Sequence, residues 1–159
     1  MAIERERKFL LKDSTWKDVA GGGVSYVQGY IHSSENKTIR VRIAGDNAFL
    51  TIKGAIFKDD PAARNEYEYN IPVNDAKEML ESLCTEGQIE KVRYKIPYKG
   101  NLWEVDEFLG ANQGLVVAEV EFNEKNQDIA LPTWIGKEVT EDKRYTNASL
   151  ARDSYSNFL

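Results

Sequence analysis

The chain of 159 residues has little of the chemistry that thiols and imidazoles supply, because it contains one cysteine and one histidine. The single cysteine, Cys84, excludes an internal disulfide and a metal cage built from thiolates. Cys84 falls in the apolar register of an expected helix, so we interpret it as a small packing residue. His32 lies near the end of an expected strand, where a rim or surface position is favoured over a catalytic one. Candidate functional groups must therefore be sought among the other residue types.

The chain also lacks long apolar runs and an excess of positive charge. No hydrophobic stretch approaches the roughly 20 residues that a membrane-spanning helix needs. Charged residues stand at the start of the chain, where a signal peptide would have its apolar segment. The net charge of −5 provides no global attraction to nucleic acid or to anionic lipid. We therefore expect a cytoplasmic protein that has neither a membrane nor a nucleic acid as its partner.

What the chain has instead is a series of segments in which apolar and polar residues alternate. Alternation with a period of two predicts β-strands that are polar on one face. Turn residues at positions 45–47 and 99–101 indicate hairpins. Eight strands with mostly short connections predict one antiparallel sheet, either open or closed into a barrel. The expected strands are Ile3–Leu11, Ser25–His32, Lys37–Ala44, Ala48–Gly54, Arg64–Pro72, Ile89–Pro97, Asn101–Leu109 and Gly114–Asn123.

Helices are expected to be few, so the predicted fold class is mainly β with some α+β character. Asn74 is a candidate N-cap for a helix over Asp75–Thr85. The length of the chain and the absence of any linker predict a single domain over residues 1–159. Two more helical segments are expected: a short turn at 132–135 and a terminal helix from Thr146 or Asn147 to Ser156.

The polar faces of the strands carry charges of the same sign at alternate positions. Glu4 and Glu6 share a face with Lys8 on the first strand, and Arg40 and Arg42 share a face on the third. Like charges this close repel, so each pair needs an opposite neighbour or a counter-ion. A barrel with its charged faces inward supplies such neighbours, and its outward residues, Tyr67 and Tyr69 among them, would pack under the helices. A sandwich with solvated charged faces is the alternative. The other charged-face residues are Lys53, Arg64, Glu66, Glu68, Lys91, Arg93, Glu104, Asp106, Glu119 and Glu121.

These motifs occur together in an order that resembles the triphosphate tunnel metalloenzymes, also called the CYTH superfamily. The signature Glu-x-Glu-x-Lys of that family is matched by Glu4, Glu6 and Lys8. Each motif alone is weak, but the whole ordered set covers almost the entire chain. The later matching segments are Thr38–Arg42, Leu50–Gly54, Arg64–Glu68, Lys91–Tyr94, Trp103–Asp106, Ala118–Phe122 and Glu138–Asn147.

The resemblance implies a closed eight-stranded antiparallel tunnel with a few flanking helices, which binds a triphosphate together with Mg²⁺ or Mn²⁺. Arginine and lysine suit phosphate oxygens, and carboxylates suit hard divalent cations. The triphosphate-binding residues that it implies are Lys8, Arg40, Arg42, Lys53, Lys91 and Arg93. The metal ligands that it implies are Glu4, Glu6 and Glu121, followed by Glu119. The residues to which it assigns a supporting role, holding basic side chains, are Glu66, Glu68 and Asp106.

The resemblance also implies a metal-dependent hydrolase that acts on phosphoanhydride bonds. The short chain and the segment Gln28-Gly29-Tyr30 are similar to small bacterial members that hydrolyse inorganic tripolyphosphate to pyrophosphate and phosphate. Lys91 and Arg93 would stabilise or protonate the leaving phosphate. Tyr30, facing inward, would hydrogen-bond Lys8 and influence which triphosphates react. The catalytic set is completed by Glu4 and Glu6, because the metal that they hold would lower the pKa of the attacking water.

Other functions share the same triphosphate site, so the fold does not separate them. The alternatives are a class IV adenylate cyclase, which forms cyclic AMP and pyrophosphate from ATP, and a nucleotide or thiamine triphosphatase. A non-catalytic sensor of polyphosphate or nucleotide is a further alternative, although pure anion binding would need only the basic residues. A homodimer would be unsurprising for such a barrel. Either Lys143 or Arg144 is expected to reach a mouth of the tunnel.

Overall fold

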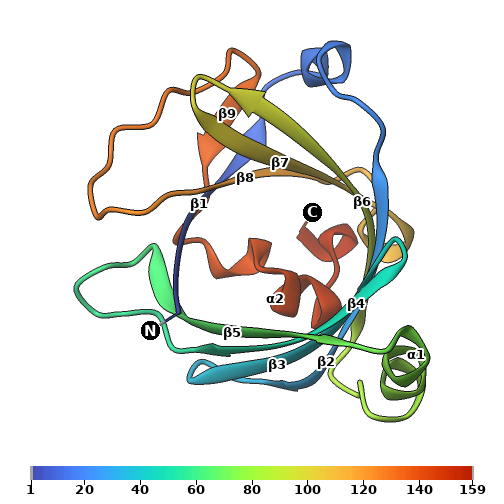
Figure 1. Ribbon diagram of the computed structural model, residues 1–159. Helices are drawn as coiled ribbons and strands as arrows, with labels where there is room; N and C mark the ends of the chain where they lie inside the picture. Colours follow the sequence, from blue (N-terminus) through green and yellow to red (C-terminus); the bar gives the residue numbers. More distant parts are fainter. Residues whose placement is uncertain (1, 159) are drawn as a thin grey trace.

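The computed structural model describes residues 2–158, and its main feature is a closed antiparallel β-barrel (Figure 1). Eight strands form the barrel, and a ninth pairs with the first strand. The prediction of a mainly β fold around an eight-stranded antiparallel barrel is confirmed. The strands are β1 (Ile3–Leu11), β2 (Val24–Ser33), β3 (Lys37–Ala44), β4 (Asn47–Gly54), β5 (Ala63–Ile71), β6 (Gln88–Tyr98), β7 (Asn101–Phe108), β8 (Val116–Glu121) and β9 (Ile135–Glu138).

The observed strand ends agree closely with those predicted from the alternation of apolar and polar residues wherever that alternation is long. β1 and β3 have the predicted bounds, and the ends of the other barrel strands differ from prediction by no more than two residues. Strand β9 has no counterpart among the predicted strands, because four residues are too few for a periodic signal. The helical turn expected near 132–135 is one hydrogen-bonded turn, from the Ile135 N–H to the Pro132 carbonyl, and it leads directly into β9.

The barrel closes through β1, which has neighbours on both edges. On one edge, residues Glu6–Leu10 pair with β8. The other edge is divided, since Ile3–Arg5 pair with β5 and Phe9–Leu11 pair with β9. Because side chains alternate across a strand, closure at β1 turns Glu4, Glu6 and Lys8 toward the interior while Arg5 and Arg7 remain outside. Arg5 accordingly pairs with Asp60, and Arg7 pairs with Glu138.

The longer helix, α1 (Val73–Ser82), packs outside the barrel against the wall formed by β2, β3 and β4 (Figure 1). It begins immediately after Pro72, so the prediction of Asn74 as its N-cap is wrong. Proline has a fixed φ and no N–H, so it can end a strand and precede the first helical turn without losing a hydrogen bond. Gly29 of β2 lies under this helix, beside Leu80 and Cys84.

The terminal helix, α2 (Asn147–Arg152), is shorter than expected. Thr146 caps it, because the Thr146 hydroxyl accepts a hydrogen bond from the Ser149 N–H at 3.1 Å. The prediction that this helix runs to Ser156 is wrong, since Asp153 adopts an extended conformation and ends it. Four 3₁₀ helices complete the structure: η1 (Thr15–Asp18), η2 (Gly110–Asn112), η3 (Lys143–Tyr145) and η4 (Tyr155–Phe158).

Much of the apolar packing lies outside the barrel wall, which leaves the interior free for polar groups. The outward face of β7 contributes Trp103, which is fully buried against Phe9 and Trp134. Trp16 of η1 covers the neighbouring Tyr94 on β6. Under α1, a second outer cluster contains Val41 and Leu80. The barrel is thus apolar on most of its outer wall, as the inward-charged arrangement requires.

One end of the barrel is closed from within by apolar side chains. Ile89, Phe108 and Val117 stand on inward-facing strand positions and pack against Leu150 of α2. Figure 1 shows the C-terminal segment, drawn in red, folded across the barrel opening. The interior therefore changes along its axis from a charged tunnel to an apolar closure.

Helices and loops do not cover the whole outer face of the barrel. Tyr67 and Tyr69 of β5 were expected to pack under helices, but their exposed fractions are 40% and 57%. That expectation is wrong because α1 packs mainly against β2, β3 and β4. None of the helices in residues 2–158 combines the length and the apolar character that crossing a membrane would take.

We predict that Gly29→Val destabilises the protein by about 1–3 kcal/mol through overpacking. A Cβ atom at this position would lie 2.8 Å from Cys84 Cβ and 2.9 Å from Leu80 Cδ2, so α1 would have to shift. Urea unfolding measures the change. Gly22→Val is the matched control, because a Cβ there meets no atom within 4 Å. Equal stability of the two variants would contradict this description of the α1 contact.

Candidate active site

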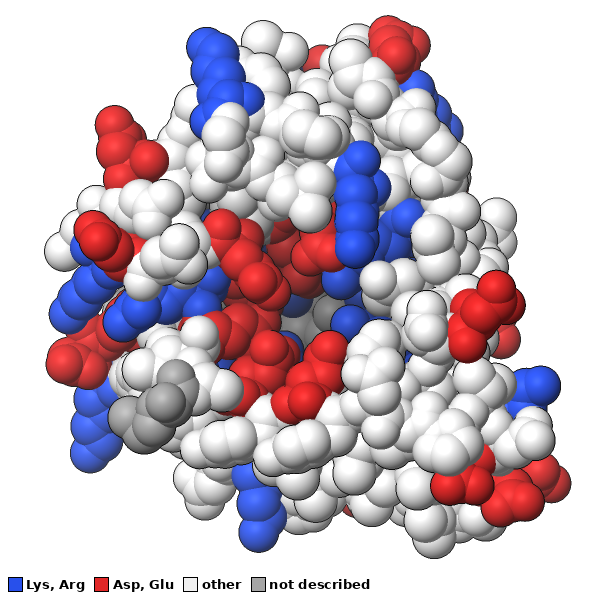
Figure 2. Space-filling view, viewed as in Figure 1, with Lys and Arg blue, Asp and Glu red and all other residues white. Residues whose placement is uncertain are grey.

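The charged faces of the strands enclose a tunnel with a volume of about 970 Å³. Figure 2 looks into its mouth, where acidic and basic side chains surround a central opening. The strands supply these groups because barrel closure brings the inward positions of β1, β3, β4, β5, β6, β7 and β8 to a common space. Lining residues from the predicted set include Glu4, Glu6, Lys8, Tyr30, Arg40, Arg42, Lys53, Glu66, Glu68, Arg93, Glu119 and Glu121.

Three carboxylates gather where β1 meets β8. Glu4, Glu6 and Glu121 each place one oxygen within 4.8 Å of the others. Burial, Glu119 and Glu4 raise the pKa of Glu6 well above its usual range. Burial together with Glu4 and Glu104 raises the pKa of Glu121 to about 7. This cluster of three carboxylates is therefore short of positive charge, and its oxygen atoms suit a hard divalent cation such as Mg²⁺ or Mn²⁺.

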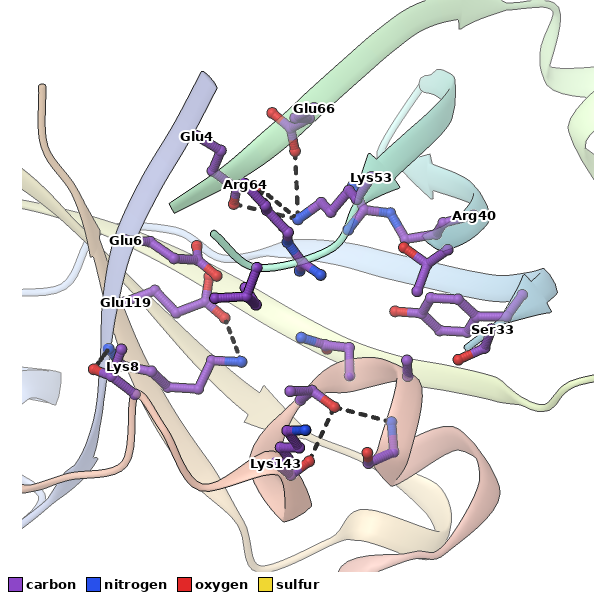
Figure 3. Close-up of a pocket in the computed structure, with 18 of the residues that line it drawn as sticks. Glu4, Glu6, Lys8, Ser33, Arg40, Lys53, Arg64, Glu66, Glu119 and Lys143 are labelled. Carbon is purple, nitrogen blue, oxygen red and sulfur yellow. Dashed lines mark hydrogen bonds and ion pairs between the residues drawn. The ribbon is translucent and has the colours of Figure 1, made fainter. Parts of the chain in front are cut away.

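Glu4 differs from its two neighbours because cations lie beside it. Burial alone would raise its pKa, but Lys53 and Arg64 outweigh that effect and hold the pKa of Glu4 at about 2. Lys53 Nζ lies 2.9 Å from Glu4 Oε2 and 3.4 Å from Glu66 Oε2 (Figure 3). Arg64 Nε lies 4.0 Å from Glu4 Oε2. Glu4 therefore connects the cluster of three carboxylates to the basic side chains of Lys53 on β4 and Arg64 on β5.

The two arginines of β3 have unlike surroundings. Arg40 Nη2 lies 3.7 Å from Glu68 Oε2 and donates a hydrogen bond to Thr51. Arg42 pairs with no carboxylate among residues 2–158; its Nε donates to Gln28 Oε1 at 2.9 Å. Its guanidinium lies 4.9 Å from the centre of the Tyr26 ring. Burial, Arg40 and Arg93 lower the pKa of Arg42 to about 10, so an anion beside it would be favourable.

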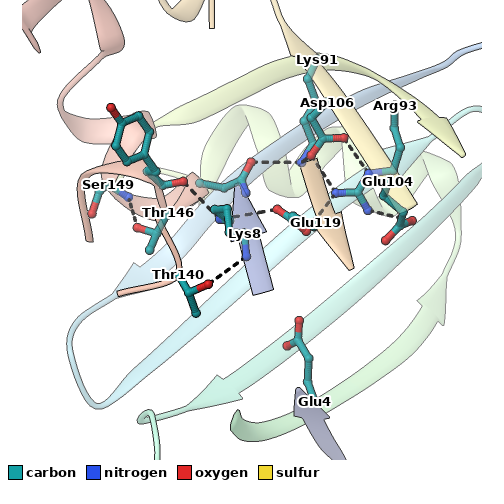
Figure 4. A network of polar contacts seen from close by, with 12 residues as sticks. Glu4, Lys8, Lys91, Arg93, Glu104, Asp106, Glu119, Thr140, Thr146 and Ser149 are labelled. Carbon is teal, nitrogen blue, oxygen red and sulfur yellow. Dashed lines mark hydrogen bonds and ion pairs between the residues drawn. The ribbon is translucent and has the colours of Figure 1, made fainter. Parts of the chain in front are cut away.

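A second group of paired charges lies on β6, β7 and β8 (Figure 4). Arg93 forms a two-point contact with Asp106, with Nε–Oδ1 at 2.7 Å and Nη2–Oδ2 at 2.8 Å. Glu104 lies 3.3 Å from the same guanidinium. Glu119 lies between two cations, 3.6 Å from Arg93 and 3.5 Å from Lys8. Lys8 and Arg93, together with the other positive groups nearby, lower the pKa of Glu119 despite its burial.

Lys91 is placed differently from the other predicted phosphate ligands. Its exposed fraction is 1%, and within the described chain it lies behind the residues that line the tunnel cavity. Its ammonium contacts Asp106 Oδ2 at 2.8 Å and Asn147 Oδ1 at 3.0 Å. Burial, Arg93 and Arg42 outweigh the attraction of Asp106 and lower the pKa of Lys91 to about 7. Lys91 can therefore exist in either protonation state near neutral pH.

Tyr30 faces the tunnel as expected but has a different partner. Its hydroxyl accepts a hydrogen bond from Gln28 Nε2 at 3.1 Å. The ammonium of Lys8 donates instead to the carbonyl of Tyr145 at 3.1 Å, on the C-terminal segment. Tyr30 and Gln28 thus form one polar unit, which Gln28 extends to Arg42.

Many tunnel residues lay outside the predicted site, among them Arg64, Tyr26 and Asn147. Arg64 alternates with Glu66 on β5, and this spacing was a sufficient signal to include it. Tyr26 had no comparable signal, because an aromatic strand residue usually has a structural role. Asn147 ended a segment that matches the family, but it was interpreted only as a candidate start of the terminal helix. Of the two basic residues at 143 and 144, Lys143 lines the tunnel and pairs with Glu35, while Arg144 pairs with Asp142.

Comparisons with known proteins agree with this geometry. The model of the CYTH domain family matches residues 2–155. The chain is 48% identical over 158 residues to an inorganic triphosphatase of Acetivibrio thermocellus, covering 99% of both chains. It is 39% identical over 153 residues to an inorganic triphosphatase of Nitrosomonas europaea, covering 93% of this chain and 96% of the relative. A crystal structure of an inorganic triphosphatase superposes with a TM-score of 0.65 and 33% identity over 96% of each chain. The chain belongs to the CYTH domain family.

Proposed function

We propose that this protein is a metal-dependent inorganic triphosphatase that hydrolyses tripolyphosphate to pyrophosphate and phosphate. The observation that carries the proposal is the pattern of uncompensated charge in the tunnel. A cluster of three carboxylates that is short of positive charge lies in the same cavity as Arg42, a half-buried cation with no carboxylate partner among the described residues. A triphosphate with its metal ion supplies both missing charges. Two relatives named inorganic triphosphatase support the same substrate class.

Basic side chains from four strands, β1, β3, β4 and β6, would bind the phosphate oxygens. Arg40, Arg42 and Arg93 present planar guanidinium groups, which suit two-point contact with phosphate. Lysine acts as a more mobile point charge, and Lys8, Lys53 and Lys91 complete the proposed set. Supporting carboxylates lie beside four of these six cations, in the pairs Arg40–Glu68, Lys53–Glu66, Lys91–Asp106 and Arg93–Asp106. Such pairs would hold the side chains in place before the substrate enters.

Glu4, Glu6 and Glu121 are the proposed ligands for Mg²⁺ or Mn²⁺, with Glu119 next to them. Their crowding and the raised pKa values of Glu6 and Glu121 support this assignment, because a cation would relieve the repulsion. The bound metal ion would supply charge neutralisation for the phosphates and a lower pKa for the attacking water. Lys53 and Arg64 leave Glu4 ionised throughout the neutral range, so at least one ligand is permanently charged.

Lys91 and Arg93 are proposed to act on the leaving phosphate. A general acid works best when its pKa is close to the operating pH, and the pKa of Lys91 is about 7. Arg93 stays charged and would stabilise negative charge that develops as the phosphoanhydride bond breaks. Tyr30 would contribute to the choice of triphosphate through its contact with Gln28. A cytoplasmic location and a homodimer stay predictions.

We predict that Arg42→Ala lowers kcat/KM for tripolyphosphate about 100-fold, because it removes a preorganised charge from the phosphate site. Phosphate release with Mg²⁺ or Mn²⁺ measures the effect. Arg7→Ala is the matched control: it removes the same charge from the outer wall, where Arg7 pairs with Glu138, and should stay within about twofold of wild type.

Wild-type protein should release phosphate from tripolyphosphate faster than from ATP or thiamine triphosphate in the same assay. Formation of cyclic AMP and pyrophosphate from ATP would instead identify a cyclase. Tight binding of tripolyphosphate with no turnover would identify a sensor, and either result would reject the proposed hydrolase.

Metal binding is expected to depend on pH through Glu121. Because the raised pKa of Glu121 keeps it protonated below about 7, Mn²⁺ affinity should increase as the pH rises from about 6 to 8. Glu121→Gln should weaken Mn²⁺ binding and reduce this slope, as calorimetry would show. Glu107→Gln changes the net charge equally but lies away from the tunnel, so it should bind Mn²⁺ like wild type. A metal affinity unchanged in Glu121→Gln would exclude Glu121 as a ligand.

A further inference from the structure

Lys91 lies at the boundary between the charged tunnel and the apolar closure of the barrel. Its Nζ is 5.8 Å from the centre of the Tyr26 ring and 5.6 Å from that of Phe108. An ammonium has three N–H donors, and two of them are used here, by Asp106 Oδ2 and by Asn147 Oδ1. One donor therefore remains for another acceptor.

Asn147 reaches Lys91 from a distant part of the chain. It is the first residue of α2, and Thr146 and the buried Leu150 hold this helix in the end of the barrel. Asn147 also lines the tunnel cavity, whereas Lys91 lies behind the lining. The Asn147 amide thus contacts the ammonium at the edge of the space that the substrate would occupy.

We propose that Asn147 is a positioning residue for Lys91: with Asp106, its amide oxygen fixes the direction of the ammonium so that the remaining N–H serves the leaving phosphate. The inference rests on the proposed function, in which Lys91 is the proton donor. Asn147 acts through Lys91 and needs no change in its own charge. The C-terminal segment thereby contributes to the chemistry as well as to closing the barrel.

A neutral acceptor suits this position because the charges around Lys91 are nearly balanced. Two carboxylates face it, Asp106 from β7 and Glu119 from β8, and two guanidinium groups face it, Arg93 from its own strand and Arg42 from β3. Tyr26 of β2 contributes a ring face. A carboxylate at position 147 would add repulsion toward phosphate, and an apolar residue would leave a buried N–H without an acceptor. The amide avoids both effects.

The direct test is the titration of Lys91 in metal-free, substrate-free protein, read from the ¹³Cε signals of lysine by NMR. The Lys91 signal is identified by its loss in Lys91→Arg. Asn147→Asp should raise the titration midpoint by about 1 to 3 pH units, because a carboxylate beside the ammonium favours the charged form. Asn147→Ala should lower the midpoint, because the charged form loses an acceptor.

Asn112→Ala is the matched control, since Asn112 holds the same C-terminal segment from another side. Its Oδ1 accepts from the Tyr155 N–H at 2.8 Å, and its Nδ2 donates to the Leu150 carbonyl. Asn112→Ala should lower the melting temperature without moving the Lys91 midpoint. An unchanged midpoint in Asn147→Asp, or equal shifts in Asn112→Ala and Asn147→Ala, would overturn the inference.

Turnover provides the second readout. Asn147→Ala should lower kcat for tripolyphosphate by about tenfold or more, with a much smaller change in KM. The basic limb of the kcat–pH profile should move to higher pH in Asn147→Asp, in parallel with the NMR midpoint. Wild-type protein that releases no phosphate would reject the proposed function, whereas the NMR midpoints, measured without substrate, would still support or overturn the positioning of Lys91. If Asn147→Asp is active and the basic limb of its kcat–pH profile stays in place, the role of Asn147 is rejected while the proposed function stands.

Discussion

The pairing of β1 on both edges is the constraint on which the rest of the structure depends. Without the short contact between β1 and β5 the sheet would be open, and its charged face would be solvated. Closure instead confines Glu4, Glu6 and Lys8 with charges from six other strands in one cavity. In that space water screens charges less well, so each side chain affects the protonation of its neighbours. The apolar packing has moved to the outer wall, where Trp103 and Val41 are buried.

The confined charges are paired unevenly, and the uneven pairing is what prepares the tunnel for a ligand. Arg93 and Asp106 satisfy each other in a two-point contact. Arg42 has an amide and a ring as partners, and Glu121 is held near like charges. A protein selected for stability alone would have little reason to retain such groups, since holding a charge beside like charges without a compensating partner is costly. A polyphosphate with a divalent cation would compensate both, which connects the electrostatics of the free protein to its proposed activity.

The C-terminal segment links the end of the fold to the middle of the site. It closes the barrel with Leu150, and it supplies acceptors to two interior lysines, the Tyr145 carbonyl for Lys8 and the Asn147 amide for Lys91. These lysines are proposed to bind or protonate phosphate, so the segment influences their direction and charge. Packing at the closed end and chemistry in the tunnel are therefore coupled through two hydrogen bonds.

The sequence by itself determined the eight barrel strands and the charged face of each, because alternation over long segments is a local property that survives without knowledge of the partners. The ordered motifs indicated the family, and only that resemblance implied that the charged faces point inward. The sequence also identified most of the tunnel cations and carboxylates, since strand parity places them on one face. Only the tertiary structure decided the pairing of β9, the end of α2 at Arg152 and the place of Asn147, because each depends on segments far apart in the chain. The tertiary structure also decides the protonation of Lys91 and Glu121. The sequence identifies both as ionisable residues, but their pKa values depend on which charges barrel closure brings beside them.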